Sequence, residues 1–401
     1  MAASAITPVA TLSISIPAPS VPGRLRLAGL LVGALFFFTA SVLAVAGTPV
    51  EFAKGRVSFQ GALAQYQQIT VTGGWPIISP GGKLKIGDQG DRVAILRQRL
   101  SRSNDLLPAS VGGDLFDSDL DGAVRRFQLR HGLHVDGVVG SGTMSALNVP
   151  TAVRTRQLEL NRERGQLLLR DLEARAILVN IADYSLAVLE DGRAVLDMRV
   201  VVGRPDRQTP VFRGAVTTLV LNSYWLIPPM IAVKDVLPHV RKDPGYLGRL
   251  GIRVFQVGEA GAQEIDAQAI DWRYLSAAHF PYRLRQDPGP RNAMGQVKFI
   301  FANPYGVFLH DTPSRELFSL TKRTLSSGCI RVEKPLELAA YLLRGTTLGS
   351  LEAIKDALTV AHAKTVKLPE PVPIHLIYLT AWGDESGTVQ FRSDIYGQDD
   401  F

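Results

Sequence analysis

The sequence predicts an α+β protein: a mostly antiparallel β domain with an inserted lid subdomain, preceded by a small three-helix domain and an N-terminal signal or anchor segment. Two patterns carry this prediction. Apolar residues recur at helical spacing between residues 91 and 147, and β-branched and polar residues alternate from residue 174 onward. With 401 residues, 46% of them hydrophobic and 20% charged, the chain has the composition of a globular protein of more than one domain.

These patterns divide the chain into successive segments. They are a signal peptide or membrane anchor (1–47), a linker with a scaffold helix (48–83), a three-helix domain (84–150), a connecting helix (151–173), a β domain (174–353) with an insert (228–292), and a C-terminal helix and strands that complete the scaffold (354–401). A long interruption of a β domain is often a lid or a binding loop. Because the strand pattern lapses in the insert, we expect helix, turns and irregular loop there.

The N-terminal segment predicts export. Arg24 and Arg26 precede an apolar run at 27–46, which ends in the small residues Ala44-Val45-Ala46. Twenty apolar residues are also enough to span a bilayer without cleavage. Both alternatives place the rest of the chain outside the cytoplasm, so the choice between cleavage and anchoring stays open.

The three-helix domain contains an acidic stretch with the opening of an EF-hand calcium loop. Asp117, Asp119 and Asp121 precede Gly122, but the twelfth loop position is Gln128 and not the bidentate Glu that calcium requires. A helix N-cap followed by an acidic first turn explains the same residues. We therefore expect no calcium site at 117–128.

Composition excludes two further classes. The net charge of +7 is a mild excess that favours an anionic surface such as a cell wall, and it lacks the concentrated basic runs of nucleic-acid-binding proteins. One cysteine and seven histidines leave little material for a structural zinc site.

The single cysteine, Cys329, lies in the stretch SSGCIRV and cannot form an intramolecular disulfide. It is either a small buried residue or a nucleophile. A nucleophile needs a base, and His310 at the end of the expected strand GVFLH is the candidate.

The neighbours of this cysteine suit such chemistry. Gly328 permits a tight turn, so the backbone N–H groups of Cys329 and of Gly328 or Ser327 are expected to form an oxyanion hole. Arg331 would share the face of Cys329 in a strand, where its charge could lower the thiol pKa or bind a substrate carboxylate.

Longer phrases resemble a known family. HDTPSRELFSLTKRTLSSGCIRV (310–332) resembles the active-site signature of the L,D-transpeptidases, which have a YkuD-like catalytic domain. GDQGDRVAILRQRL, AVRRFQLRHGLHVDGVVG and TMSALN resemble the small peptidoglycan-binding domain, and NSYWLIPPMIAVKDVLPHVRKDPGYL resembles the capping region of the large Gram-negative type. Two features depart from the family: Ser327 stands where many members have His, and the linker NRERGQLLLRDL lacks a tryptophan-rich stretch.

The resemblance implies a mechanism. Cys329 would attack the carbonyl between the diamino acid at position three of a tetrapeptide stem and its terminal D-Ala, giving a thioester. His310 would accept and donate protons, oriented by the backbone carbonyl of Asp311. A second stem peptide would resolve the thioester as a 3-3 cross-link in cell-wall biogenesis and the control of cell shape. The resemblance implies a periplasmic enzyme that carbapenems acylate, with no metal and no organic cofactor.

Further residues are candidates for substrate binding. They are Arg331, Ser326, Ser327, Asn292, Tyr224 and Trp225. The aromatic pair and the insert would line or cover the donor groove, although core packing explains the two aromatic residues equally well.

Other functions stay open. Water as acceptor would make the protein an L,D-carboxypeptidase, and the lysine of a wall-anchored protein would make it a protein-to-peptidoglycan ligase. A non-catalytic wall-binding protein is an alternative of a different class. The expected partners are the tetrapeptide donor and the stem-peptide acceptor of peptidoglycan, and the membrane if the N-terminal segment is not cleaved; no nucleic acid is expected.

Overall fold

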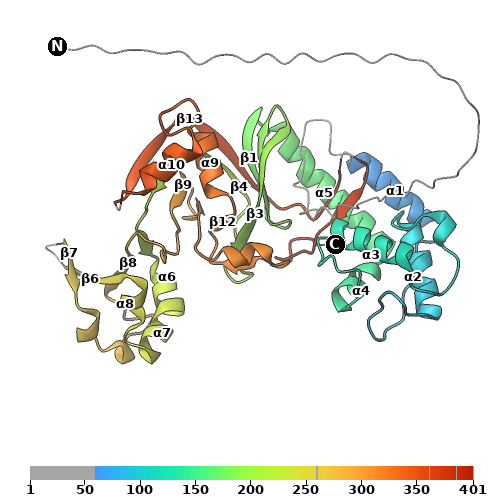
Figure 1. Cartoon of the computed structure of the whole chain (residues 1–401), viewed down its shortest axis with the longest axis horizontal. Helices are drawn as coiled ribbons and strands as arrows, with labels where there is room; N and C mark the ends of the chain where they lie inside the picture. Colours follow the sequence, from blue (N-terminus) through green and yellow to red (C-terminus); the bar gives the residue numbers. More distant parts are fainter. Residues whose placement is uncertain (1–58, 259–260, 361, 385, 401) are drawn as a thin grey trace, which may run out of the picture. The chain divides into compact units, whose positions relative to one another are not determined.

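The computed structural model describes residues 59–258, 261–360, 362–384 and 386–400 (Figure 1). The signal or anchor predicted for residues 1–47 lies outside these residues. Within them, the structure contains no helix with the length and apolar character needed to cross a bilayer.

The predicted three-helix domain is confirmed. It consists of α2 (Asp91–Arg102), α3 (Ser118–Arg130) and α4 (Ser141–Leu147), with the 3₁₀ turn η1 (Pro108–Ser110). Its core contains Leu96, Leu120 and Phe127, all completely buried. Asp117 caps α3, because its side chain accepts a hydrogen bond from the N–H of Leu120, as the helix-cap interpretation of the acidic stretch requires.

Two helices flank this domain in the sequence. They are α1 (Phe59–Val71) and α5 (Thr151–Arg170), which pack against each other. A C-terminal hairpin, β14 (Ala381–Gly383) and β15 (Val389–Phe391), adds Phe391 to the core that α1 and α5 share. The two ends of the described chain therefore meet beside the three-helix domain (Figure 1).

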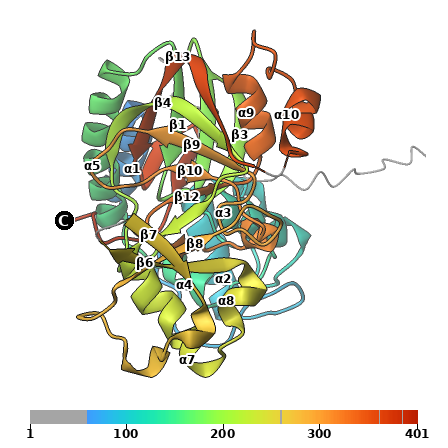
Figure 2. The ribbon, with the colours of Figure 1, turned by 90° about the vertical axis from the view of Figure 1, so that its left-hand side faces the viewer.

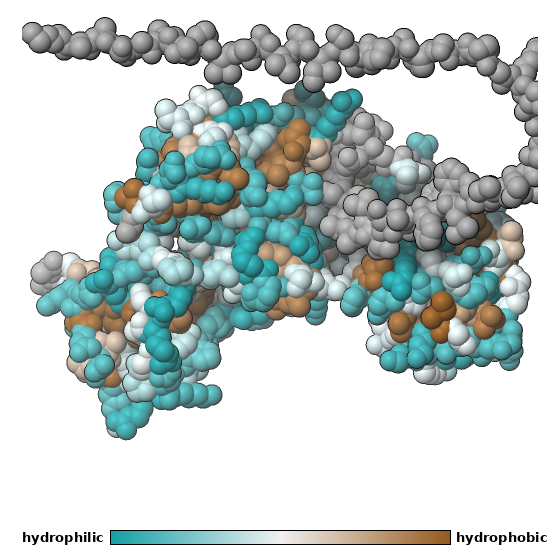
Figure 3. All heavy atoms as spheres, in the orientation of Figure 1, coloured by the Kyte–Doolittle hydropathy of each residue, from teal (hydrophilic) through white to brown (hydrophobic). Residues whose placement is uncertain are grey.

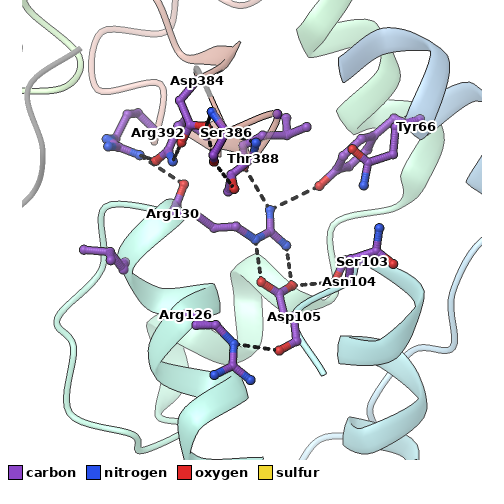
Figure 4. A pocket seen from close by; sticks show the side chains of 15 residues that line it. Tyr66, Ser103, Asn104, Asp105, Arg126, Arg130, Asp384, Ser386, Thr388 and Arg392 are labelled. Carbon is purple, nitrogen blue, oxygen red and sulfur yellow. Dashed lines mark hydrogen bonds and ion pairs between the residues drawn. The ribbon is translucent and has the colours of Figure 1, made fainter. Parts of the chain in front are cut away.

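A buried ion pair holds this junction together (Figure 4). Arg130 donates from Nε and Nη2 to the two carboxylate oxygens of Asp105, at 2.6 and 2.5 Å. Its Nη1 donates to the hydroxyl of Tyr66 on α1 and to the carbonyl of Val389 in the hairpin, both at 3.2 Å. One guanidinium thus connects three segments of the chain, beside a polar cavity of about 500 Å³.

The β domain is built on one nine-stranded sheet, mostly antiparallel as predicted. Its strands are β1 (Arg175–Asn180), β2 (Ser185–Glu190), β3 (Arg193–Gly203), β4 (Phe212–Leu221), β9 (Val297–Phe301), β10 (Leu309–His310), β11 (Thr324–Ser326), β12 (Ile330–Val332) and β13 (Lys364–Ile377). Their order is β11-β3-β12-β10-β9-β4-β13-β1-β2, and β2 pairs with β3 as well. This extra pairing closes the sheet on itself, which gives β2 a second partner and leaves the short strand β11 at the end of the order.

The turn between β2 and β3 is the predicted Asp191-Gly192 hairpin. Both residues have positive φ, 48° and 78°, as a type I′ turn requires. The main core of the domain lies between the sheet and the helices α9 (Pro335–Leu342) and α10 (Leu351–Leu358), whereas α5 packs on the opposite face of β1 and β2 (Figure 2).

The insert forms a subdomain with its own core. Its elements, with the adjoining strand β5, are β5 (Trp225–Ile227), α6 (Pro229–Ile231), the π-helical turn η2 (Ala232–Val236), α7 (Leu237–Lys242), α8 (Tyr246–Leu250), β6 (Ile252–Gly258), β7 (Gly261–Ile265), the 3₁₀ turns η3 (Ala267–Ala269) and η4 (Trp272–Tyr274), and β8 (Tyr282–Gln286). On the face shown in Figure 3, its apolar residues form separate small patches among hydrophilic ones.

The expectation of helix, turns and irregular loop in the insert is wrong in part. A four-stranded sheet of order β5-β8-β6-β7 runs through it. In β6, Ile252 and Val254 are buried and Arg253 is exposed, so the period-two alternation is present but spans few residues. In β8 the two buried positions are Leu284 and Gln286. Because one of them is a glutamine, a search for alternating hydrophobic residues does not detect this strand.

Candidate active site

Strand pairing brings the cysteine and the histidine to one face of the sheet. β10 and β12 are parallel neighbours, with Leu309 opposite Ile330 and His310 opposite Arg331. Leu309 and Ile330 are completely buried in the main core. Because side chains alternate along a strand, His310 and Arg331 lie on the other face, and Cys329 precedes Ile330 on that same side.

The thiol of Cys329 is half-buried, and its Sγ lies 3.9 Å from the carbonyl oxygen of Gly306. Burial raises the pKa of Cys329 above its ordinary value of 9.0, although the positive charges of Lys298 and Arg331 act in the opposite direction. The charge of Arg331 does act to lower the thiol pKa, as expected, but the net shift of that pKa is upward. Burial outweighs the nearby positive charges, so the resting group is a thiol.

The imidazole of His310 is buried and held by the next residue. Its Nδ1 lies 2.5 Å from the backbone carbonyl oxygen of Asp311. Since a carbonyl only accepts, Nδ1 carries the proton in the neutral ring and Nε2 is the basic nitrogen. Burial, followed by the charge of Arg331, lowers the pKa of His310 to about 3, so the ring is neutral near pH 7.

No hydrogen bond joins Cys329 to His310 among the residues that the structure describes. Hydrogen bonds between catalytic groups are often long before substrate binds and tighten in the complex. A neutral thiol beside a neutral imidazole is the resting state that these surroundings favour.

Hydrogen bonds within the chain fix the turn that carries the cysteine. Gly328 has φ of 111°, a conformation that a side chain would strain. Ser326 Oγ donates to the carbonyl of Cys329 at 2.5 Å and accepts from the N–H of Gly328 at 3.2 Å. These two bonds close the turn from inside.

Two sequence-based assignments change as a result. The N–H of Gly328 is occupied by Ser326, so it is not free for an oxyanion, whereas the N–H of Cys329 has no acceptor among the described residues. Ser326 is only 3% exposed, and its hydroxyl is used within the turn, so it positions the turn and does not face substrate.

A loop that carries no recognised motif, residues 203–209, contacts this turn from the other side. Thr209 Oγ1 donates to the carbonyl of Gly328 at 2.8 Å and accepts from the N–H of Gly203 at 2.9 Å. Arg207 Nη1 donates to Ser327 Oγ at 2.9 Å. The stretch GRPDRQTP lies about 120 residues before the cysteine, and no spacing rule connects the two.

Arg331 presents an unsatisfied cation. Its Nε is buried without a hydrogen-bond partner, and its guanidinium makes no ion pair within the described residues. Burial lowers its pKa, which is the sign of a charge held without adequate compensation. A carboxylate arriving from outside would supply the missing partner.

Asn292 lies inside the base of the insert and not on the surface beside Cys329. It is 1% exposed and donates to the carbonyls of Ser223 and Asp287, at 3.1 and 3.0 Å. Its Oδ1 accepts from the N–H of Met294 at 2.7 Å. The predicted substrate contact is therefore replaced by a structural role, because its hydrogen-bonding groups are already used inside the protein.

The two aromatic candidates lie on the insert side. Tyr224 is 39% exposed, and the guanidinium of Arg285 lies 4.6 Å from the centre of its ring. Trp225 packs partly buried against the core of the insert. A role for either in covering the donor groove stays a prediction.

The comparisons with known proteins agree with the motifs. Residues 174–354 match the model of the L,D-transpeptidase catalytic domain (YkuD), and residues 89–147 match the family described as "Putative peptidoglycan binding domain". A curated Haemophilus influenzae protein named "Putative L,D-transpeptidase" is 36% identical over 247 residues, covering 61% of this chain. The chain spans about half, 48%, of that relative.

Solved structures of L,D-transpeptidases are also similar in part. One from Xylanimonas cellulosilytica is 17% identical, with 74% of this chain and 98% of that chain covered and a TM-score of 0.23. One from Stackebrandtia nassauensis is 12% identical, with 75% and 97% covered and a TM-score of 0.25.

Proposed function

We propose, on the premise that this chain contains an L,D-transpeptidase catalytic domain and a peptidoglycan-binding domain, that it forms 3-3 cross-links between peptidoglycan stem peptides through a thioester on Cys329. The observation that carries the proposal is the half-exposed thiol of Cys329 on the same sheet face as a neutral, oriented His310. The N-terminal pattern adds the proposal that the enzyme works in the periplasm, either released or anchored to the inner membrane.

The first half of the reaction forms the thioester. The sulfur of Cys329 attacks the carbonyl carbon between the diamino acid and the terminal D-Ala, while Nε2 of His310 takes the thiol proton. Because both groups are neutral at rest, this proton moves during the attack and not before it. The proton then passes to the departing amine, and D-Ala leaves.

Two features support charge stabilisation in this step. The free N–H of Cys329 is placed to donate to the oxygen of the tetrahedral intermediate. The unpaired guanidinium of Arg331 is suited to the free carboxylate of the terminal D-Ala, which would bring the scissile bond toward Cys329.

The second half of the reaction resolves the thioester. The side-chain amine of a second stem attacks the carbonyl and His310 accepts its proton. The C–S bond breaks as the new amide bond remains, and His310 returns the proton to the departing sulfur of Cys329, which restores the resting thiol. Water as acceptor would release a tripeptide instead, and a protein lysine would give a ligase. The peptidoglycan-binding domain favours an acceptor that is part of the wall.

The test is mass spectrometry of muropeptides after incubating the chain with a tetrapeptide-bearing disaccharide, with Cys329→Ala as the matched control. We expect dimers linked diamino acid to diamino acid, absent with the variant. Tripeptide monomers alone would replace the proposal with an L,D-carboxypeptidase. Unchanged substrate in both samples would leave a wall-binding protein.

A further inference from the structure

The guanidinium of Arg207 joins the insert to the cysteine turn by hydrogen bonds on both sides. Arg207 follows β3 in the loop at 203–209, and its side chain is only 6% exposed. Its guanidinium donates from Nη1 and Nη2 to the carboxylate of Asp235, which belongs to the insert. From the same Nη1 it also donates to Ser327 Oγ at 2.9 Å.

The position of Asp235 in the insert is unusual. It lies in η2, a π-helical turn between α6 and α7. Such turns are rare inside helices and occur frequently at functional sites. Here the carboxylate of Asp235 meets the guanidinium of Arg207 on another part of the chain.

The charges explain why this contact would be sensitive to the position of the insert. Arg207 is almost fully buried, and a buried cation without a counterion is costly. Asp235 makes the hydrogen-bonded ion pair, whereas Asp206 lies 3.7 Å from Nε, which has no hydrogen-bond partner. Moving the insert away would leave Arg207 with Asp206 alone and would favour its turning toward water.

Three contacts join the cysteine turn to the same loop. Arg204 donates its N–H to the carbonyl of Ser326 at 3.0 Å, Thr209 holds the carbonyl of Gly328, and Arg207 holds the side chain of Ser327. The first two contacts lie within the β domain. The third comes from the guanidinium that hydrogen-bonds to Asp235 of the insert, whereas the side chain of Arg204 makes a longer ion pair with Asp235, at 3.8 Å.

We propose that Asp235, Arg207 and Ser327 form a latch through which docking of the insert holds the Cys329 turn in its reactive geometry. The proposal rests on the proposed function, because the reactive geometry is that of thioester formation. In this description Arg207 and Asp235 are positioning residues, and neither touches the reacting atoms. Thioester formation would then be fast only while the insert covers the site, which also shields the intermediate from water.

The experiment measures the rate at which a carbapenem acylates Cys329, followed by intact-protein mass spectrometry of the full chain. Asp235→Asn removes the charge that anchors Arg207, and Ser327→Ala removes only the link from Arg207 to the turn. We expect each to slow acylation about tenfold, because displacement of a nucleophile by a fraction of an ångström is costly. Asp235→Glu keeps the charge and should recover most of the rate.

Non-additivity separates a latch from two independent defects. If Asp235 acts through Ser327, the double variant should be no slower than either single variant. If the two substitutions caused independent structural damage, their effects on the acylation rate would multiply, and the double variant would be slower by about a hundredfold. Asp243→Asn is the matched control, since it breaks an exposed ion pair with Arg249 inside the insert, away from the turn, and should leave the rate unchanged.

Failure of the latch and failure of the proposed function give different results. Normal acylation in the Asp235→Asn variant, or multiplicative effects in the double variant, would overturn the latch while leaving Cys329 as the nucleophile. No acylation of the unaltered chain, together with unchanged muropeptides, would overturn the proposed function and the latch with it.

Discussion

Two arginines, one buried and one partly buried, have opposite surroundings. Arg130 at the junction is paired with Asp105 and donates to Tyr66 and Val389 as well. Burial alone would lower its pKa, yet Asp105 raises that pKa above the ordinary value. Arg331 beside the cysteine is partly buried, but it has no ion pair among the described residues and its pKa is lowered.

The difference separates stability from function. A buried charge whose donors are satisfied within the chain fixes the arrangement of the segments it joins and has nothing left to offer a ligand. A buried charge left without a partner costs stability, and the protein recovers that cost only when a ligand of opposite charge binds. Of the two, Arg331 is therefore the one expected to matter for substrate.

The largest effect is expected when the ion pair between Arg130 and Asp105 is broken. Asp105→Asn leaves Arg130 buried without its counterion and should lower the free energy of unfolding by about 3–5 kcal/mol, measured by urea denaturation. Glu159→Gln, which breaks an exposed pair with Arg156, is the control and should change it by less than about 1 kcal/mol. If both variants change the free energy of unfolding by the same amount, the Arg130–Asp105 pair does not hold the junction together.

The second largest effect is expected at Arg331, the arginine without a partner. Arg331→Met removes a partly buried charge without breaking an ion pair, so the melting temperature should not fall. Release of D-Ala should drop about 100-fold in kcat/KM, equivalent to about 2.7 kcal/mol, because a charge-assisted contact to the substrate carboxylate is lost. A lower melting temperature with normal turnover would mean that Arg331, like Arg130, contributes to stability and not to substrate binding.

The pH dependence of thiol reactivity tests whether the site rests in its neutral form. Cys329 is the only cysteine, so alkylation by iodoacetamide reports on it alone. Because burial raises its pKa above 9.0, the thiolate is the minor form near neutral pH, and the rate should rise with pH without levelling off below about pH 9. A plateau near neutral pH would instead indicate a thiolate–imidazolium pair.

The smallest effect concerns Lys298. Its ammonium lies 3.7 Å from the ring centre of Phe308 and lowers the thiol pKa against the effect of burial. Lys298→Met should therefore shift the alkylation profile to higher pH, by less than about one unit. A shift to lower pH would show that Lys298 buries the thiol more than it stabilises the thiolate.

Local patterns were sufficient where residues close in sequence determine the structure. The three helices follow from apolar spacing, and the hairpin at Asp191-Gly192 follows from turn chemistry. The proximity of Asp311 to His310 is similarly local, since the carbonyl and the ring belong to adjacent residues.

Contacts between distant residues were the ones that sequence could not supply. The sequence around Gly328 does not show that Ser326 occupies its N–H, and the sequence around Asn292 does not show that four backbone groups bond to its side chain. Arg207 carries no motif at all, because its importance arises from β3 ending beside the cysteine turn. The strands of the insert escaped notice since each has at most two buried positions.

The position of β13 constrains the order in which the protein can assemble during synthesis. This strand, at residues 364–377, lies in the interior of the closed sheet, between β4 and β1, and joins them in register. A ribosome must therefore have released nearly the whole described chain before the sheet can close around its core. The helical segments can fold as they emerge, whereas the strands before β13 have to wait with an open edge, and they are then exposed to chaperones and proteases.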